Sequence, residues 1–345
     1  MKKIFAATAV TIAMSILAGS AWANTADKRI ALSNNYAGNS WRQAMLRSWD
    51  KVAKQAVADH IVAAADAFTT ADKEVPTQAA QLQNLILQGY NAIVIDAASP
   101  DALNGAVKAA CAAGITVVSF DGTVSAPCAY RVGIDYAGSG REEVDYLAKR
   151  FPQGGDLLEI RGLAGTSIDN LIHQGIMEGL KAHPNFKIVA SVTGNWDEAT
   201  AQKAVATVLP SLPKITAVVD QGGDGYGAAQ AFMAAGRKVP VIIMGNRQVE
   251  LAWWKQQHAK TGYETWSASI PPGGVTLAFW VAQQILDGKK VPHEIIFPAL
   301  SVDQAQLDAA LKSTPVGGVY SVEYDQAETI KAIEASQSKG SSSRS

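Results

Sequence analysis

Polar and tryptophan side chains follow six of the short apolar runs in this chain, and their types suit a small ligand rich in hydroxyl groups. Asp, Asn, Gln and Arg side chains make paired hydrogen bonds to adjacent hydroxyls. Indole rings stack on the C–H face of a sugar or polyol. The candidate ligand-binding residues are Asn39, Trp41, Arg42, Asp121, Asn170, Trp196, Gln221, Asp224, Asn246, Arg247 and Ser269.

Each of these residues also has a purely structural interpretation. Asn39 or Ser40, and Asp197, can serve as N-caps of the helices that they precede. Trp41 and Trp196 can pack in a core or a lid. A separate alternative concerns the ligand: Arg42 and Arg247 leave room for an acidic group on it. The recurrence of such residues at six strand ends is what favours binding over the structural alternative.

Signatures of catalysis are weak. Residues 165–169 break the G-x-S-x-G nucleophile motif at its last position, and 221–227 lack the G-K-[ST] ending of a phosphate loop. The five histidines are scattered without metal-ligand spacing. We therefore expect no catalytic residue, metal or cofactor, and an exported enzyme is the minor alternative.

The elements that must position the candidates alternate along the chain, which predicts parallel sheets covered by helices on both faces. Two such stretches, 29–133 and 156–269, predict an α/β protein of two similar doubly wound lobes. Predicted strands are 29–33, 60–65, 92–96, 116–121, 156–161, 186–192, 217–220, 241–245 and 265–269. Predicted helices are 40–58, 74–88, 100–113, 139–150, 167–182, 197–209, 225–235, 249–260 and 274–286.

The two ends of the chain differ in composition from the rest. Lys2 and Lys3 precede an apolar run and Ala21-Trp22-Ala23, the pattern of a signal peptide cleaved after Ala23. A membrane anchor is the alternative, although the run is shorter than the ~20 residues of a span. Export would place the mature protein outside the cytoplasm. The Ser-, Lys- and Gly-rich tail 336–345 is predicted to be disordered.

The cysteine count favours a disulfide, and the net charge limits which classes of partner the protein can bind. Cys111 and Cys128 make an even pair, which favours a disulfide in an oxidising compartment. The net charge of −1 becomes −3 once the signal and its two lysines are removed. No basic stripe is present, so a nucleic-acid partner is not expected.

Several motifs resemble the periplasmic sugar-binding proteins of bacterial ABC importers, of the ribose-binding type. They are Ile93-Val94-Ile95-Asp96-Ala97 before Pro100, the run 114–121 that ends in Asp121, 162–165 leading into Gly175 and Gly179, and 241–245. By position, Asn39 and Trp41 match the family's first-loop contacts, Asp121 its sugar-hydroxyl carboxylate and Trp196 its stacking aromatic residue. Gln221 or Gly222 falls near an amide contact of the family, and Ser269 falls near another.

The chain departs from the ribose-binding pattern at three places. Gly122 and Asn170 stand where arginines are expected, and Asn246-Arg247 replaces an aromatic–aspartate pair. These changes argue against ribose itself while leaving another small sugar or polyol.

The resemblance implies a periplasmic monomer that delivers a pentose, hexose or sugar alcohol to an ABC transporter permease. Three crossovers near 132–136, 269–271 and 298–300 would form the hinge. The N-terminal lobe would hold 24–133 and 271–298, and the C-terminal lobe 134–270 and 299–335. A partner of a membrane sensor or chemoreceptor is the alternative. Sugar repressors share the fold, but they carry a DNA-binding segment where this chain has the signal pattern.

Overall fold

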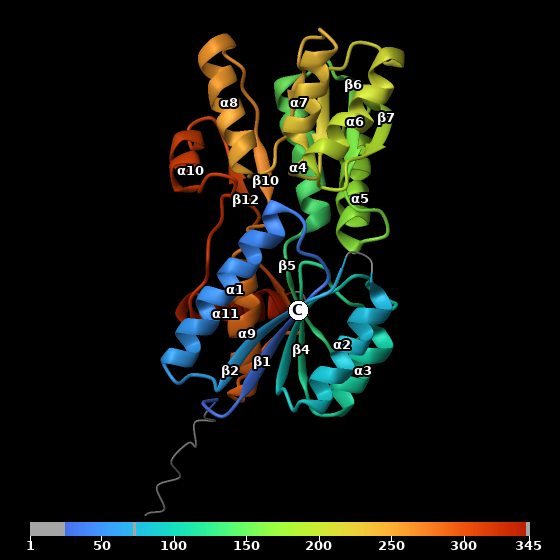
Figure 1. The fold of residues 1–345 in the computed structure, drawn as a ribbon. Coiled ribbons are helices and arrows are strands. Elements are labelled where there is room, and N and C mark those ends of the chain that lie inside the picture. Colours follow the sequence, from blue (N-terminus) through green and yellow to red (C-terminus); the bar gives the residue numbers. More distant parts are fainter. Residues whose placement is uncertain (1–24, 72–73, 343–345) are drawn as a thin grey trace, which may run out of the picture.

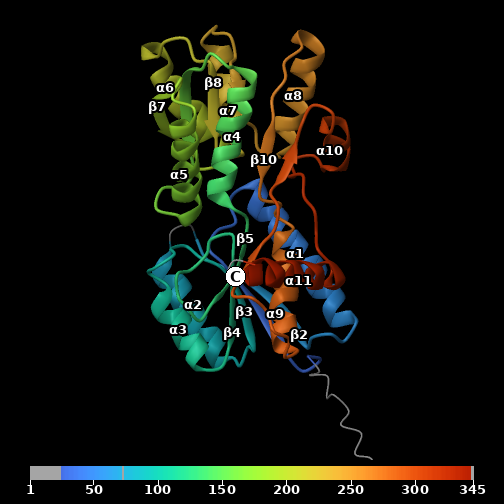
Figure 2. The same ribbon diagram turned by 180° about the vertical axis from the view of Figure 1, so that it is seen from behind.

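The protein forms two lobes stacked end to end, seen in opposite views in Figures 1 and 2. We describe residues 25–71 and 74–342 of a computed structural model. Each lobe is built on one parallel sheet. The predicted α/β architecture of two doubly wound lobes is therefore confirmed.

The first lobe contains a six-stranded sheet in the order β11-β5-β4-β3-β1-β2, in which every neighbouring pair is parallel. All five residues of β3 are buried, because helices cover both faces. The strands are β1 (Arg29–Asn34), β2 (Ala64–Thr69), β3 (Ala92–Asp96), β4 (Thr116–Phe120), β5 (Tyr130–Gly133) and β11 (Glu294–Ile296). The helices are α1 (Ser40–Ala58), α2 (Val75–Leu87), α3 (Asn104–Ala112), α9 (Gly274–Leu286) and α11 (Gln326–Ser342).

The second lobe contains a four-stranded parallel sheet in the order β7-β6-β8-β9. Its strands are β6 (Gly155–Arg161), β7 (Phe186–Thr193), β8 (Ala217–Asp220) and β9 (Val241–Ile242). Its helices are α4 (Tyr136–Arg150), α5 (Ser167–Ala182), α6 (Glu198–Val208), the 3₁₀ turn η1 (Leu209–Ser211), α7 (Gly225–Ala234), α8 (Gln248–Thr261) and α10 (Leu307–Ser313). A separate antiparallel pair joins β10 (Ser267–Ser269) to β12 (Leu300–Val302).

Within residues 25–71 and 74–342, the chain passes between the lobes four times, one more than the three crossovers predicted. Three passages lie between β5 and α4, between β10 and α9, and between β11 and β12, in the segments where crossovers were predicted. The fourth lies at Tyr320–Ser321. The Tyr320 N–H donates to the Asn246 carbonyl of the second lobe, whereas Ser321 Oγ accepts from the Gly273 N–H at the start of α9.

Helix α11 therefore packs on the first lobe, against α9 and β11, and the prediction that 299–335 lie wholly in the second lobe is wrong for this helix. Ile333 is buried, and the Tyr324 N–H donates to Thr276 Oγ1. The predicted disorder of the tail is also wrong up to Ser342, because α11 continues through it. Gln337 Nε2 donates to the Lys290 carbonyl and so ties the last turns to the lobe.

Some predicted boundaries also differ. The second strand was expected at 60–65 but β2 starts at Ala64, because His60 adopts a left-handed φ of 55° in the turn after α1. The strand expected at 265–269 pairs antiparallel with β12. Strands β5, β11 and β12 were not predicted, since each has only three or four residues.

Cys111 at the end of α3 is bonded to Cys128, which confirms the predicted disulfide. Their Cα atoms are 6.4 Å apart and the bridge closes a loop with a sequence separation of 17. Within residues 25–71 and 74–342, no helix is long and apolar enough to cross a membrane. The predicted signal at 1–23 lies outside the described residues.

Candidate ligand-binding site

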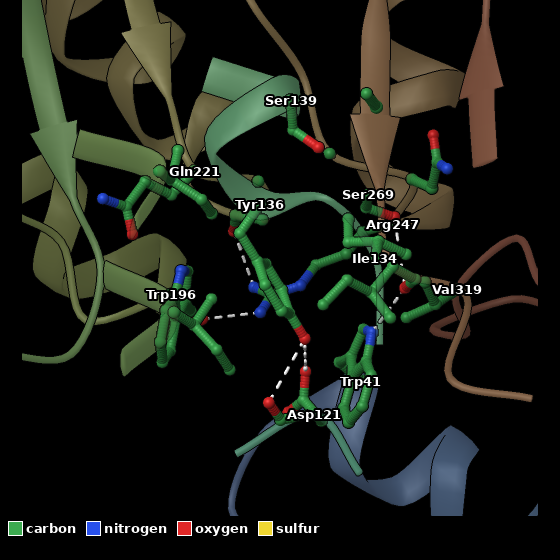
Figure 3. Close-up of a pocket in the computed structure, with 18 of the residues that line it drawn as sticks. Trp41, Asp121, Ile134, Tyr136, Ser139, Trp196, Gln221, Arg247, Ser269 and Val319 are labelled. Atoms are coloured by element: carbon green, nitrogen blue, oxygen red, sulfur yellow. Dashed lines mark hydrogen bonds between the residues drawn. The ribbon is translucent and has the colours of Figure 1, made fainter. Parts of the chain in front are cut away.

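A cavity of about 90 Å³ lies between the two lobes (Figure 3). One water needs roughly 10–15 Å³, so the cavity has room for about six to nine water-sized groups. That size suits a small molecule. Nine of the predicted residues line it: Asn39, Trp41, Arg42, Asp121, Trp196, Gln221, Asn246, Arg247 and Ser269.

A second, larger cavity of about 210 Å³ adjoins this one, and the two share Asn39, Arg42, Ile168 and Trp196. Its other lining residues include Asn35 and Tyr36 from the first lobe and Thr166 and Asp197 from the second. The two cavities together form a cleft between the lobes, with Trp196 on the wall of both.

Asn39 and Trp41 line the cavity and also make contacts that stabilise the fold. Asn39 is the N-cap of α1, and its Oδ1 accepts from the Arg42 N–H at 2.8 Å, so the structural interpretation of Asn39 is confirmed. The Trp41 ring stacks on Phe120 with centroids 6.2 Å apart. The Trp41 indole N–H donates to the Ile270 carbonyl at 2.8 Å, which anchors the ring to a crossover segment.

Arg42 links two buried carboxylates of the first lobe. Its guanidinium pairs with Asp96 and, through Nη2, with Asp121 Oδ2 at 3.1 Å. Asp96 Oδ1 accepts from the Gly122 N–H, and a Cβ at Gly122 would lie 2.6 Å from the Ala97 carbonyl oxygen. No side chain fits at Gly122, and Arg42 supplies the cation beside Asp121 instead.

Asp121 presents its carboxylate at the end of β4 with a left-handed φ of 58°. Burial raises the pKa of Asp121, while the Arg42 charge and a hydrogen bond from Tyr136 act against the rise. The Tyr136 hydroxyl lies 3.2 Å from the Asp121 carbonyl oxygen and 3.5 Å from Oδ1. Figure 3 shows the Tyr136 side chain reaching from the start of α4 toward Asp121.

Arg247 holds the loops of the second lobe that carry Trp196. Its Nη2 donates to the Trp196 carbonyl at 2.5 Å and its Nη1 to the Gly223 carbonyl at 2.6 Å. Trp196 has a left-handed φ of 54°, and this hydrogen bond helps to fix its conformation. A Cβ at Gly223 would lie 2.7 Å from the guanidinium, so glycine is required for this packing.

Three buried carboxyl groups surround Arg247: Asp220, Asp224 and Glu250. Burial raises the pKa of Asp220 and of Asp224 well above the ordinary value. Repulsion from Glu250 adds to the rise at both groups, Asp220 adds to the rise at Asp224, and Arg247 acts against it. Arg247 is thus an internal counter-ion.

Gln221 and Asn246 line the cavity, but their amides are used within the lobe. Gln221 Oε1 accepts from the Gly162 N–H, and its Nε2 donates to Asp169 Oδ1 at 3.0 Å. Asn246 Nδ2 donates to the Leu300 carbonyl, and its Oδ1 accepts from Ser267 Oγ at 2.6 Å. These two residues shape the wall more than they offer hydrogen bonds to a ligand.

Asn170 and Asp224 do not line the cavity. Asn170 is exposed, and its Oδ1 accepts from Arg161 Nη2 at 3.4 Å. Asp224 is fully buried next to Arg247 at the start of α7. The structure does not bring these two candidates to the cavity, because a strand-end loop has several polar residues and only some of them turn toward the other lobe.

Sequence reasoning missed the wall formed by α4 and α5. Tyr136, Ser139 and Glu143 from α4, and Ile168 and Ile172 from α5, line the cavity. Spacings of three and four residues place each set on one face of its helix, which was the available signal. Within the described residues, no group of three or more His, Cys, Asp or Glu side chains could hold a metal ion.

Comparison with known proteins finds one matching family model and several similar binding proteins. Residues 30–290 match the family model described as "periplasmic binding protein domain". A xylitol-binding protein of Mycolicibacterium smegmatis is 28% identical over 251 residues, covering 71% of this chain and 70% of that protein. The ribose import binding protein RbsB of Escherichia coli is 29% identical over 168 residues, which span 48% of this chain and 56% of RbsB.

Among solved structures, an ABC transporter solute-binding protein from Thermobispora bispora superposes with a TM-score of 0.84 at 31% identity. The superposition covers 91% of this chain and 97% of that protein.

Proposed function

Because the chain belongs to the periplasmic binding protein domain family, we propose that it captures a small neutral sugar or polyol between its lobes and delivers it to an ABC transporter permease. In this proposal the protein is an exported monomer cleaved after Ala23, and it has no catalytic role. Ligand closes the lobes by hinge motion, and the transporter recognises the closed form.

The residues that line the cavity are the main support for this proposal. It joins an aromatic face from each lobe, Trp41 and Trp196, to the buried carboxylate of Asp121. A sugar or polyol presents hydroxyls along its edge and C–H groups on its faces, and those are the groups that carboxylates and indole rings bind. The related proteins named for xylitol and ribose support the same class.

The charges around the cavity favour a neutral ligand over a sugar acid. Arg42 is paired with Asp96 and Asp121, and Arg247 donates to two carbonyl groups beside buried carboxyls. An acidic ligand would also meet Asp121 and Glu143 on the cavity wall. The acidic ligand that the two arginines allowed at the sequence level is therefore disfavoured.

A thermal-shift screen tests the ligand class. Pentoses, hexoses, pentitols, tetritols, sugar acids and amino acids are each added in excess. A ligand at 100 times its dissociation constant adds about 2.7 kcal/mol of stability, and we expect this from a neutral sugar or polyol. Stabilisation only by sugar acids, amino acids or peptides would contradict the proposal.

Uptake and mass measurements test the transport role. A strain that lacks the gene should lose high-affinity uptake of the labelled ligand, and the exported protein should begin at Asn24. Retained uptake with loss of chemotaxis would support the sensor alternative instead.

A further inference from the structure

Glu143 is a buried carboxyl group on the cavity wall with few partners. It lies on α4, is 4% exposed, and is one of the residues that line the cavity. Its Oε2 accepts from the Asp220 N–H at 3.2 Å. Among the described residues, no other hydrogen bond to this carboxyl is seen, and its Oε1 is not among the fully buried atoms that lack a partner.

A buried carboxyl needs more than one hydrogen bond to offset its desolvation. The one backbone N–H that Glu143 satisfies could be met by an uncharged side chain. The cavity is the place where its second oxygen can find a partner, and a ligand hydroxyl can donate to it or accept from it.

The charged groups near Glu143 also favour a ligand hydroxyl as the partner of its carboxyl group. Burial raises the pKa of Glu143 well above the ordinary value, and repulsion from Asp220 and Glu159 adds to the rise. Glu159 is itself bound by His173 and Ser191. In the described part of the chain no cation pairs with Glu143, whereas Asp121 in the first lobe pairs with Arg42.

We propose that Glu143 determines ligand specificity by hydrogen-bonding one hydroxyl of the ligand from the second lobe, while Asp121 binds other hydroxyls from the first. A ligand with hydroxyls at both positions joins the two lobes. This inference rests on the proposed function and adds a binding residue from helix α4 to the strand-end loops.

The test compares wild type with Glu143→Met, which keeps the side-chain length and removes the carboxyl. Glu142→Met is the control, because Glu142 is the exposed neighbour on the same helix. Calorimetry uses the tightest binder among xylitol, D-ribose, D-allose and D-fucose, together with each of its monodeoxy analogues. Loss of a hydrogen bond to a buried carboxyl predicts affinity reduced by roughly tenfold or more in Glu143→Met, and unchanged affinity in Glu142→Met.

The analogues separate a direct contact from a structural effect. One analogue should lack the hydroxyl that meets Glu143, and it should bind wild type and Glu143→Met with the same affinity to within about twofold, because coupled losses do not add. If Glu143→Met does not fold, Glu143→Asp withdraws the carboxyl by one methylene and should show the same pattern.

Two results would overturn the inference while leaving the proposed function intact. One is wild-type affinity in the Glu143 variant, and the other is additive losses for every analogue. If none of the four compounds binds wild type, the inference falls together with the ligand class on which it rests.

Discussion

Replacing Arg42 with Met should destabilise the protein in a pH-dependent way. Asp96 is 0% exposed and Asp121 is 5% exposed, and Arg42 pairs with both. Removing one partner of a buried ion pair typically costs about 3–5 kcal/mol, because it leaves an uncompensated buried charge. At roughly 2 °C per kcal/mol for a chain of this length, the Tm should fall by about 6–10 °C.

The sign of the pH dependence follows from Asp121. Its folded pKa is raised by burial, and Arg42 acts against that rise. Without Arg42 the folded pKa rises further above the unfolded value, so the stability from this group is present at low pH and is lost as pH increases. The Tm difference from wild type should therefore be smallest at the acidic end of the pH range and should increase as the pH rises.

Differential scanning calorimetry between about pH 4 and pH 8 measures this difference. Arg47→Met is the control, since Arg47 is exposed on the same helix and should leave the Tm nearly unchanged. Adding Asp121→Asn to Arg42→Met removes one of the two unpaired carboxylates and should recover part of the loss. A Tm deficit that is the same at every pH, or no deficit near pH 8, would refute the reasoning.

The remaining predictions concern the site, the disulfide and the lobes. Asp121→Ala loses a hydrogen bond to a charged group worth ~1.5–3 kcal/mol, so calorimetry should show ligand affinity reduced by about tenfold to more than a hundredfold; wild-type affinity would exclude this residue from the site. Trp196→Ala removes the stacking face of the second lobe and should weaken the same titration, and an unchanged titration would contradict that role. Alkylation of exported protein without reductant should add no label to Cys111 or Cys128, whereas two labels on folded protein would show that they are not bonded. Replacing both cysteines with Ser should lower the free energy of unfolding by roughly 3 kcal/mol in denaturant titration, and an unchanged midpoint would mean that the bridge contributes little. Small-angle scattering should show a smaller radius of gyration with saturating ligand, and no change would argue against hinge closure.

The strand-end rule explains why much of the site could be predicted from the sequence. The carboxyl ends of parallel strands face one edge of a sheet, so residues directly after them, such as Asp121 and Trp196, lie at the cleft. The rule does not say how each loop turns. Asn170 faces Arg161 and Asp224 faces inward, and both orientations depend on tertiary packing.

Residues beyond the strand ends were harder to place. Tyr136 and Glu143 reach the cavity because the passage after β5 brings the start of α4 to the cleft. That placement depends on how the lobes join, which no local pattern shows. The polar face of α4 was readable from its spacing, but the position of the helix relative to the first lobe was not.

The C-terminal segment shows the limit of composition as a guide. A Ser-, Lys- and Gly-rich stretch has little apolar area to bury, which favours disorder. In α11 the buried Ile333 and the Gln337 hydrogen bond to Lys290 lie in or beside that stretch and hold the helix on the first lobe. Contacts between residues far apart in sequence decided this region.

A crystal structure with the best ligand from the thermal-shift screen is the most direct test of the central claim. We predict one neutral sugar or polyol in the cavity between the lobes, with its hydroxyls on Asp121 and its C–H faces against Trp41 and Trp196. A ligand bound outside this cavity, or one that contacts a single lobe without Asp121, would contradict the account.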